Sequence, residues 1–219
     1  MGLFEYLKNL NKKEEDECIE YQRPSEIQKT DYEINIPDFE YIVDNREYDK
    51  PVILIMDDFK GMATLLKDEL KRVNSIDVYK DYTIVLATGD YAAFTVKKEL
   101  LKGTKIDIGL LDITLGGVVG GIEYDGVDVA IMIKEKYPDS IVKFVTGHTL
   151  NRKNPEIFQF MQKFENHFNI PIDESYEIST INGVEVSYKH IIQKNSDRVL
   201  LMEHTLKEYE DIKNDRNIK

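Results

Sequence analysis

The sequence predicts an α/β fold in which a five-stranded parallel sheet is covered by helices on both faces. Two observations support this prediction. Short apolar runs rich in valine, isoleucine and leucine recur along the chain, and segments with apolar residues at helical spacing separate them. Such an alternation with short connections favours a doubly wound, flavodoxin-like layout, in which ligands bind at the carboxyl ends of the strands.

The alternating pattern begins after Pro51. Residues 52–56 (VILIM) have the continuous apolar character of a buried strand, and residues 62–73 repeat apolar positions at helical spacing. A second strand is expected at 82–88, and an acid opens a helix over 90–101.

The second half of the pattern repeats the same units. Its apolar runs are bounded by glycine, proline and polar residues, as short buried strands are. The expected strands cover residues 106–111, 140–146 and 190–194, and the expected helices cover residues 127–137, 154–168 and 196–212. This gives a domain over residues 51–215 with a short tail at 216–219.

Two segments do not follow the alternation. Residues 1–50 are expected to form an extension or linker, because residues 11–50 are crowded with charge and show no sustained apolar period. This linker carries isolated apolar anchors at Ile34, Ile36, Phe39 and Ile42. Residues 175–188 have period-two apolar positions around Asn182-Gly183, which predicts a β-hairpin inserted before the last strand.

Composition excludes several classes of function. The formal net charge of −12 and the pI near 4.9 repel nucleic acid and anionic lipid, so we expect no nucleic-acid partner. The chain has one cysteine, Cys18, and neither a secretory signal nor a run of about 18 apolar residues, which predicts a cytoplasmic protein. The amino terminus has one apolar side and is interpreted as a short helix that docks loosely on its own domain or frays, in preference to one that contacts a membrane surface or a partner. The oligomeric state stays open.

Functional side chains follow the expected strands at one edge of the sheet. Asp57 and Asp58 close the first strand, Asp112 the third, Thr146 the fourth and Lys194 the fifth. Three neighbouring carboxylates cannot all stay ionised without compensation, and a hard divalent cation such as Mg²⁺ suits oxygen ligands. A lysine and a hydroxyl on the other side of Asp112 are what an arriving phosphoryl group requires.

These motifs make the sequence resemble a response-regulator receiver domain of two-component signalling. The matching segments are ILIMDDF with Asp57 and Asp58, GLLDIT with Asp112, the helix after Gly126, KFVTGHT with Thr146, and IIQK with Lys194. The resemblance covers roughly residues 51–215. No single motif is specific, but their order and their positions at strand ends are specific together.

The resemblance implies a role for each matching residue. Asp112 is expected to take a phosphoryl group from a histidine kinase or phosphotransfer protein, and Lys194, the Thr146 hydroxyl and the Gly147 N–H to contact that group. Mg²⁺ is expected on Asp58, Asp112 and the carbonyl of Thr114, with Asp57 holding a metal-bound water. The implied function is a stand-alone phosphorelay switch, not an enzyme in its own right, that acts on a downstream protein target.

The sequence departs from the family pattern at three places. Ile191 occupies the position of the usual aromatic switch residue, and Asn195 follows the lysine where the family usually has proline. The glycine-rich loop over residues 114–126 is long for the family and is interpreted either as a flap over the site or, preferably, as a surface insertion.

Two alternative functions remain open at this level. One is a receiver-like interaction module that is never phosphorylated. The other is a Mg²⁺-dependent phosphatase of the haloacid-dehalogenase type, which needs an acid two residues after its aspartate nucleophile. Thr114 occupies that position here, which disfavours the phosphatase.

Overall fold

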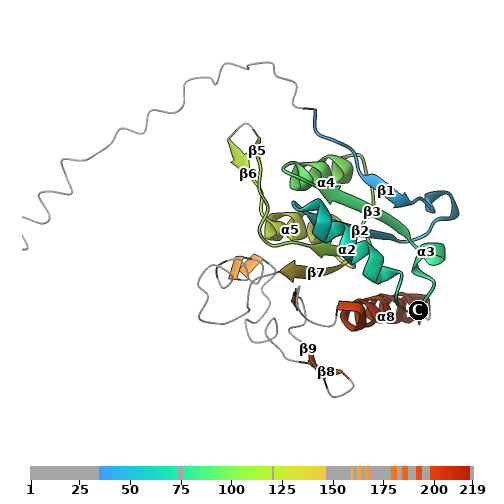
Figure 1. Ribbon diagram of the computed structural model, residues 1–219. Helices are drawn as coiled ribbons and strands as arrows, with labels where there is room; N and C mark the ends of the chain where they lie inside the picture. The colour runs from blue at the N-terminus through green and yellow to red at the C-terminus, as the bar shows by residue number, and fades with distance from the viewer. Residues whose placement is uncertain are drawn as a thin grey trace, which may run out of the picture. The chain divides into compact units, whose positions relative to one another are not determined.

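The computed structural model describes residues 35–73, 76–119, 121–146, 179–181, 184–186, 191–193 and 198–217, and single positions between 159 and 167. In this part of the chain six strands form one sheet in the order β1-β3-β2-β4-β7-β10 (Figure 1). The parallel strands are β2 (Val52–Asp57), β3 (Thr83–Thr88), β4 (Ile108–Leu111), β7 (Ile141–Thr146) and β10 (Ile191–Gln193). Numbered along the chain, their order is 2-1-3-4-5, which confirms the predicted flavodoxin-like fold class.

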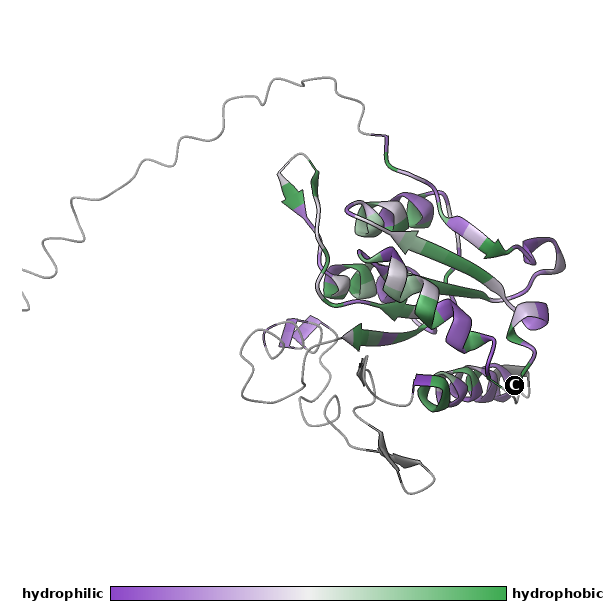
Figure 2. Ribbon diagram, viewed as in Figure 1, coloured by the Kyte–Doolittle hydropathy of each residue, from purple (hydrophilic) through white to green (hydrophobic). Residues whose placement is uncertain are grey.

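The core lies on both faces of this sheet. Every residue of β2 is buried, and successive side chains of a strand point to opposite faces. Leu54 and Met56 pack in one apolar cluster, and Ile53 and Ile55 pack in another. Figure 2 accordingly shows apolar strands between helices that are apolar on one side only.

Four long helices supply the other half of these clusters. The first cluster receives side chains from α4 (Ala92–Leu101) and α5 (Gly126–Lys136). The second receives side chains from α2 (Lys60–Leu70) and α8 (Arg198–Asn217). All four were expected from their apolar spacing, with shifts of a few residues at the ends. No helix among the described residues has both the length and the apolar character that a bilayer crossing requires.

Three smaller features complete the described part of the chain. The sequence did not predict two short helices, the 3-10 helix η1 (Arg46–Tyr48) and the helix α3 (Val78–Asp81). The Asp77 side chain caps the first turn of α3. The predicted hairpin over residues 175–188 contains the antiparallel strands β8 (Ser179–Ile181) and β9 (Val184–Val186). Its turn at residues 182–183 lies outside the described residues.

The loop that follows β4, which was interpreted from the sequence as a flap over the site or, preferably, as a surface insertion, forms a second hairpin. It pairs β5 (Val118–Val119) with β6 (Ile122–Glu123) and extends away from the sheet beyond α5 (Figure 1). Val118 and Ile122 are exposed. This hairpin is called the β5–β6 hairpin below.

The expected linker over residues 1–50 needs a correction at its carboxyl-terminal end. Residues 40–43 form β1 (Glu40–Val43), which pairs antiparallel with β3 and so adds a sixth strand to the sheet. Phe39, one of the expected anchors, is buried in the first apolar cluster. This strand was not predicted, because Glu40 and Asp44 are polar and leave no continuous apolar run. An edge strand needs no such run, since one of its sides faces water.

Ion pairs hold the segment before β1 against α4. Lys98 donates a hydrogen bond to the carbonyl oxygen of Ile36 at 2.6 Å, and its ammonium lies 3.0 Å from the Asp38 carboxylate. Lys102 lies 2.6 Å from Asp38 and 2.7 Å from Glu99. Hydrogen bonds from Lys102 and Lys98 hold the pKa of Asp38 well below its ordinary value of 3.8.

This attachment is expected to weaken in acid. Because the pKa of Asp38 is lowered by folding, its stabilising effect is fully present above about pH 3.8 and is lost as the pH falls toward the folded pKa. An Asp38→Asn variant should therefore be less stable than the wild type at pH 7, and the difference should shrink progressively as the pH falls below about 3.8. Urea unfolding at a series of pH values measures it, and a difference that grows in acid would contradict the assignment.

Part of the fourth expected helix, over residues 154–168, lies outside the described residues. Two described side chains of this segment contact α5. The Lys163 ammonium lies 2.6 Å from an Asp128 carboxylate oxygen and 3.0 Å from Asp125, and His167 lies 3.0 Å from Glu135. This segment is thus linked to α5 at both ends of that helix.

Candidate functional site

Three carboxylates meet at the carboxyl ends of β2 and β4. Asp57 is the last residue of β2, Asp58 follows it, and Asp112 follows β4. Met56 and Leu111 are paired in register, so the acids after them reach the same edge, and the Asp112 N–H donates to the Met56 carbonyl at 2.8 Å. One carboxylate oxygen from each of the three residues lies within 4.8 Å of the other two. The predicted convergence of these residues is therefore present.

Backbone N–H groups close in sequence or space orient each of these carboxylates. Asp57 accepts from the Phe59 N–H at 2.9 Å, and Asp112 accepts from the Ile113 N–H at 2.8 Å. Asp58 accepts from the Gly116 N–H at 3.1 Å. Asp57 and Asp112 are buried, whereas Asp58 is more accessible. These hydrogen bonds fix the position of each carboxylate in the cluster.

The carboxylate cluster fits a small hard cation. Opposite ligands of an octahedral Mg²⁺ ion lie about 4.2 Å apart, twice the usual distance of about 2.1 Å, so oxygens within 4.8 Å need only a slight closure or one bridging water. Two carboxylates at this separation repel each other by about 3 kcal/mol at an effective dielectric constant near 20. A divalent cation would remove this repulsion, which makes the cluster a credible metal site.

The structure describes two of the other four expected site residues, Thr146 and Thr114. Thr146 ends β7 and is completely buried, and Gln193 of β10 is its partner in register. Thr114 is exposed at the start of the loop that follows Asp112. Gly147 and Lys194 lie outside the described residues.

The start of α5 packs directly on the backbone of Asp112. A Cβ at Gly126 would overlap the Asp112 carbonyl oxygen, and the Gly126 N–H donates to the Ile113 carbonyl at 2.9 Å. Asp125 and Asp128 form a reciprocal capping box, in which each side chain accepts the backbone N–H of the other. Sequence reasoning missed this support, although a glycine directly after an acid at a helix start was a visible signal.

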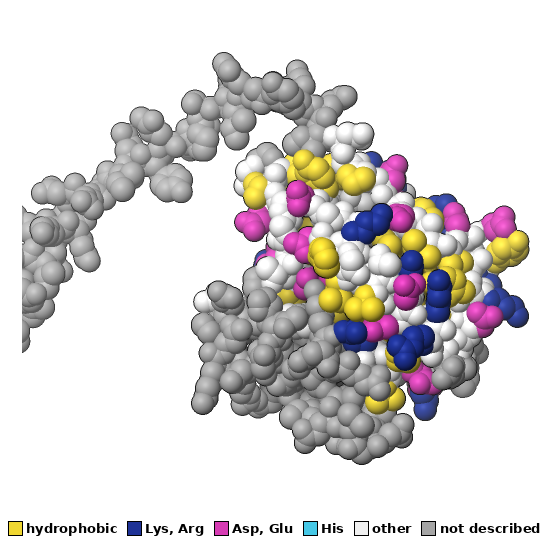
Figure 3. All heavy atoms as spheres, in the orientation of Figure 1, with side chains coloured by type: hydrophobic (Ala, Val, Ile, Leu, Met, Phe, Trp, Pro, Cys, Tyr) yellow, Lys and Arg dark blue, Asp and Glu magenta, His cyan; other side chains and the backbone are white. Residues whose placement is uncertain are grey.

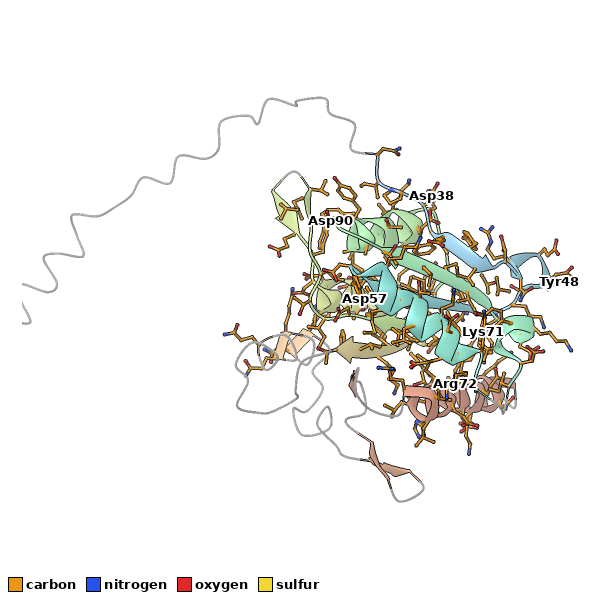
Figure 4. All side chains as sticks on the ribbon, in the orientation of Figure 1. Asp38, Tyr48, Asp57, Lys71, Arg72 and Asp90 are labelled. Carbon is orange, nitrogen blue, oxygen red and sulfur yellow. The ribbon has the colours of Figure 1, made fainter. Side chains whose placement is uncertain are left out.

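Asp90 lies near the carboxylate cluster but is not one of its members. It lies in the loop between β3 and α4, and its carbonyl oxygen is so close to Gly117 that a Cβ there would overlap it. Gly117 has φ of +100°, a conformation that L side chains rarely adopt. Figure 4 shows Asp57 and Asp90 toward the same end of the sheet, away from Tyr48 and Lys71.

A pocket of about 570 Å³ lies at the opposite edge, where the strands begin. The cationic side chains of this pocket have partners within the protein, among them a helix carboxyl end, which carries partial negative charge. Lys136 donates to the Leu100 carbonyl at the end of α4, and Lys105 pairs with Asp107. The candidate site is therefore placed at the carboxylates and not in this pocket.

Comparisons with known proteins find similarity to solved structures and none to family models or curated sequences. Solved structures similar to this chain are mostly response-regulator receiver domains.

Three of these structures have a TM-score of 0.47. They are a receiver domain protein from Methanospirillum hungatei (15% identity, 76% of this chain and 98% of that chain), the receiver domain of a modulated diguanylate cyclase from Desulfovibrio desulfuricans (17%, 76% and 98%) and a receiver protein from Sinorhizobium medicae (16%, 75% and 98%). Identities this low concern the fold alone, which the strand order already establishes.

Proposed function

We propose that this chain works as a response-regulator receiver, which accepts a phosphoryl group on Asp112 from a histidine kinase or phosphotransfer protein. The observation that carries the proposal is the carboxylate cluster within 4.8 Å at the carboxyl edge of a 2-1-3-4-5 sheet. Asp112 follows β4, the middle strand of the parallel five, and is 7% exposed. It is thus the recessed nucleophile, with Asp57 and Asp58 to one side and Thr146 to the other.

Transfer would proceed by attack of an Asp112 carboxylate oxygen on phosphorus. The new P–O bond forms as the P–N bond to the donor's imidazole breaks, and the electron pair of that bond returns to the nitrogen, which takes up a proton from water. The product is an acyl phosphate on Asp112. Such a reaction needs positioning and charge neutralisation more than further covalent chemistry.

The remaining residues would neutralise and hold the transferred group. Asp58, Asp112 and the Thr114 carbonyl are the proposed ligands of Mg²⁺, with Asp57 acting through a water, and a bound Mg²⁺ supplies positive charge beside the phosphoryl oxygens. We propose that the Thr146 hydroxyl donates a hydrogen bond to a phosphoryl oxygen. Gly147 and Lys194 receive the same assignment from their places directly after β7 and β10.

The output of the switch would be a change in protein binding. An acyl phosphate adds negative charge beside the loops after β4 and β7, and a change of this kind shifts a conformational equilibrium by on the order of a few kcal/mol. The downstream target is accordingly proposed to be another protein.

Intact mass measurement with acetyl phosphate and Mg²⁺ tests the proposal. We expect the wild type to gain one phosphoryl group and Asp112→Asn to gain none. Asp90→Asn is the matched control, because Asp90 is an acid at the same end of the sheet that lies outside the cluster. If the wild type gains nothing, the chain is a receiver-like module that is not phosphorylated.

Mg²⁺ is expected to stabilise the fold, because it binds the native cluster and not the unfolded chain. At ten times its dissociation constant the gain in unfolding free energy is about 1.4 kcal/mol. Asp58→Asn should remove most of this gain, whereas Asp68→Asn on the exposed side of α2 should keep it. Urea unfolding with and without Mg²⁺ measures the effect, and an equal loss in both variants would argue against the assigned ligands.

A further inference from the structure

Exposed apolar side chains lie in three loops at the same edge of the sheet as the carboxylate cluster. Phe59 directly follows Asp58 and is 69% exposed. Tyr91 directly follows Asp90, and Val118 and Ile122 of the β5–β6 hairpin are 59% and 51% exposed. These four residues, called the apolar rim below, come from the loops after β2, β3 and β4. Large apolar side chains kept in water around a polar site are typical of a binding surface.

Contacts between the three loops make the rim one surface. The Gly89 N–H donates to the Asp58 carbonyl at 3.1 Å, which joins the loop after β3 to the loop after β2. The Gly116 N–H donates to the Asp58 carboxylate, which joins the β5–β6 hairpin to the same residue. Close packing of Gly117 on the Asp90 carbonyl joins the hairpin to the loop after β3.

The β5–β6 hairpin is firmly anchored at its base. Tyr124, which follows β6, packs edge-to-face on Phe94 of α4 with ring centroids 5.1 Å apart. The Lys97 ammonium lies 4.7 Å from the centre of the Tyr124 ring. A two-stranded hairpin is at best marginally stable by itself in water, so this anchoring sets the position of its exposed Val118 and Ile122.

We infer that the apolar rim is the docking surface for the protein that brings the phosphorylated histidine to Asp112. This inference rests on the proposed function. Asp112 is recessed, and the donor's phosphorus must come within about 3–3.5 Å of its carboxylate oxygen. A folded donor protein cannot reach that distance without covering the side chains around the opening, whereas acetyl phosphate can enter alone.

Charge complementarity adds a second requirement for the partner. Asp90 and Glu123 are exposed beside the rim, and Figure 3 shows acidic, basic and hydrophobic side chains interspersed on the face in view. The matching surface of the donor is therefore apolar with basic residues around it. Such charges speed association, while the apolar contacts supply most of the affinity.

The test compares a protein donor with a small donor. The variant Val118→Thr/Ile122→Thr keeps the β-branched shape of the hairpin residues and adds a hydroxyl to each. Leu101→Thr is the matched control, because Leu101 is 78% exposed at the end of α4, toward the opposite edge of the sheet. Each protein is incubated with acetyl phosphate and, separately, with every histidine kinase and phosphotransfer protein of the source organism after phosphorylation.

We expect the double variant to accept phosphoryl from acetyl phosphate within twofold of the wild-type rate and from the protein donor at least tenfold more slowly. Leu101→Thr should match the wild type with both donors. Equal rates from the protein donor, equal slowing with both donors, or labelling of the wild type by acetyl phosphate but by no protein would each overturn the inference. If no donor of either kind labels the wild type, the proposed function itself fails.

Discussion

Replacing Gly126 with alanine is expected to cost about 3 kcal/mol of unfolding free energy and to slow phosphorylation of Asp112 at least tenfold. The added Cβ would overlap the Asp112 carbonyl oxygen, which belongs to the backbone and has no rotamer to change. Either α5 or the nucleophile must move, and overpacking of this kind costs about 1–3 kcal/mol or more. The gain in helix propensity, up to about 1 kcal/mol, offsets only part of it.

Gly61→Ala is the matched control for this effect. Gly61 is also in the first turn of a helix, but a Cβ there would meet only the exposed ring of Phe59, at 2.8 Å. Because that ring can rotate away into water, we expect a change within about 1 kcal/mol. Urea unfolding and the rate of labelling by acetyl phosphate measure both variants, and similar losses in the two would refute the packing argument.

The second large effect is expected at the ion pair that joins α8 to α2. Arg198 Nε donates to both carboxylate oxygens of Glu69, at 2.8 and 2.7 Å, and Glu69 is buried. Truncation by Arg198→Ala leaves that carboxylate without its cation, and removal of one partner of a buried pair costs about 3–5 kcal/mol. We expect on the order of 3 kcal/mol in unfolding free energy.

The double variant Glu69→Leu/Arg198→Met separates the charge effect from packing. Apolar residues of similar size remove both charges together, so this variant should recover most of the stability that Arg198→Ala loses. Lys60→Ala serves as a surface control, because its pair with Glu40 is exposed on both sides and should contribute less than about 1 kcal/mol. If the double variant is as unstable as Arg198→Ala, packing and not charge is responsible.

The parallel sheet could be predicted because its strands carry their own signal. Residues 52–56 are buried on both faces and appear in the sequence as an uninterrupted apolar run, whereas the buried run over 141–146 is interrupted by Lys143 and ends at Thr146. The convergence of Asp57, Asp58 and Asp112 follows from the same signal, since the carboxyl ends of parallel strands share one edge of a sheet. The helices follow from apolar spacing, and only their ends shift by a few residues.

The features that escaped prediction depend on contacts between distant segments. Strand β1 could not be predicted from its own residues, because they are partly polar and show only a weak alternation of apolar and polar positions. The strand forms by pairing with the edge of β3. The β5–β6 hairpin has strands of two residues each, too short for any periodicity to register. In the site, the hydrogen bond from Gly116 to Asp58 joins residues 58 positions apart and involves a backbone group, which has no side-chain signature.

Strand β1 has a practical consequence for anyone preparing this protein. A shortened protein that begins after residue 50, where the composition changes, would lack β1. The backbone N–H and C=O groups of β3 that pair with β1 would then face water, and such an open edge promotes strand pairing between molecules. The shortened protein would also lose Phe39 from beneath α4. Shortened versions of the protein should therefore start no later than residue 35, so that β1 stays paired with β3 as the edge strand.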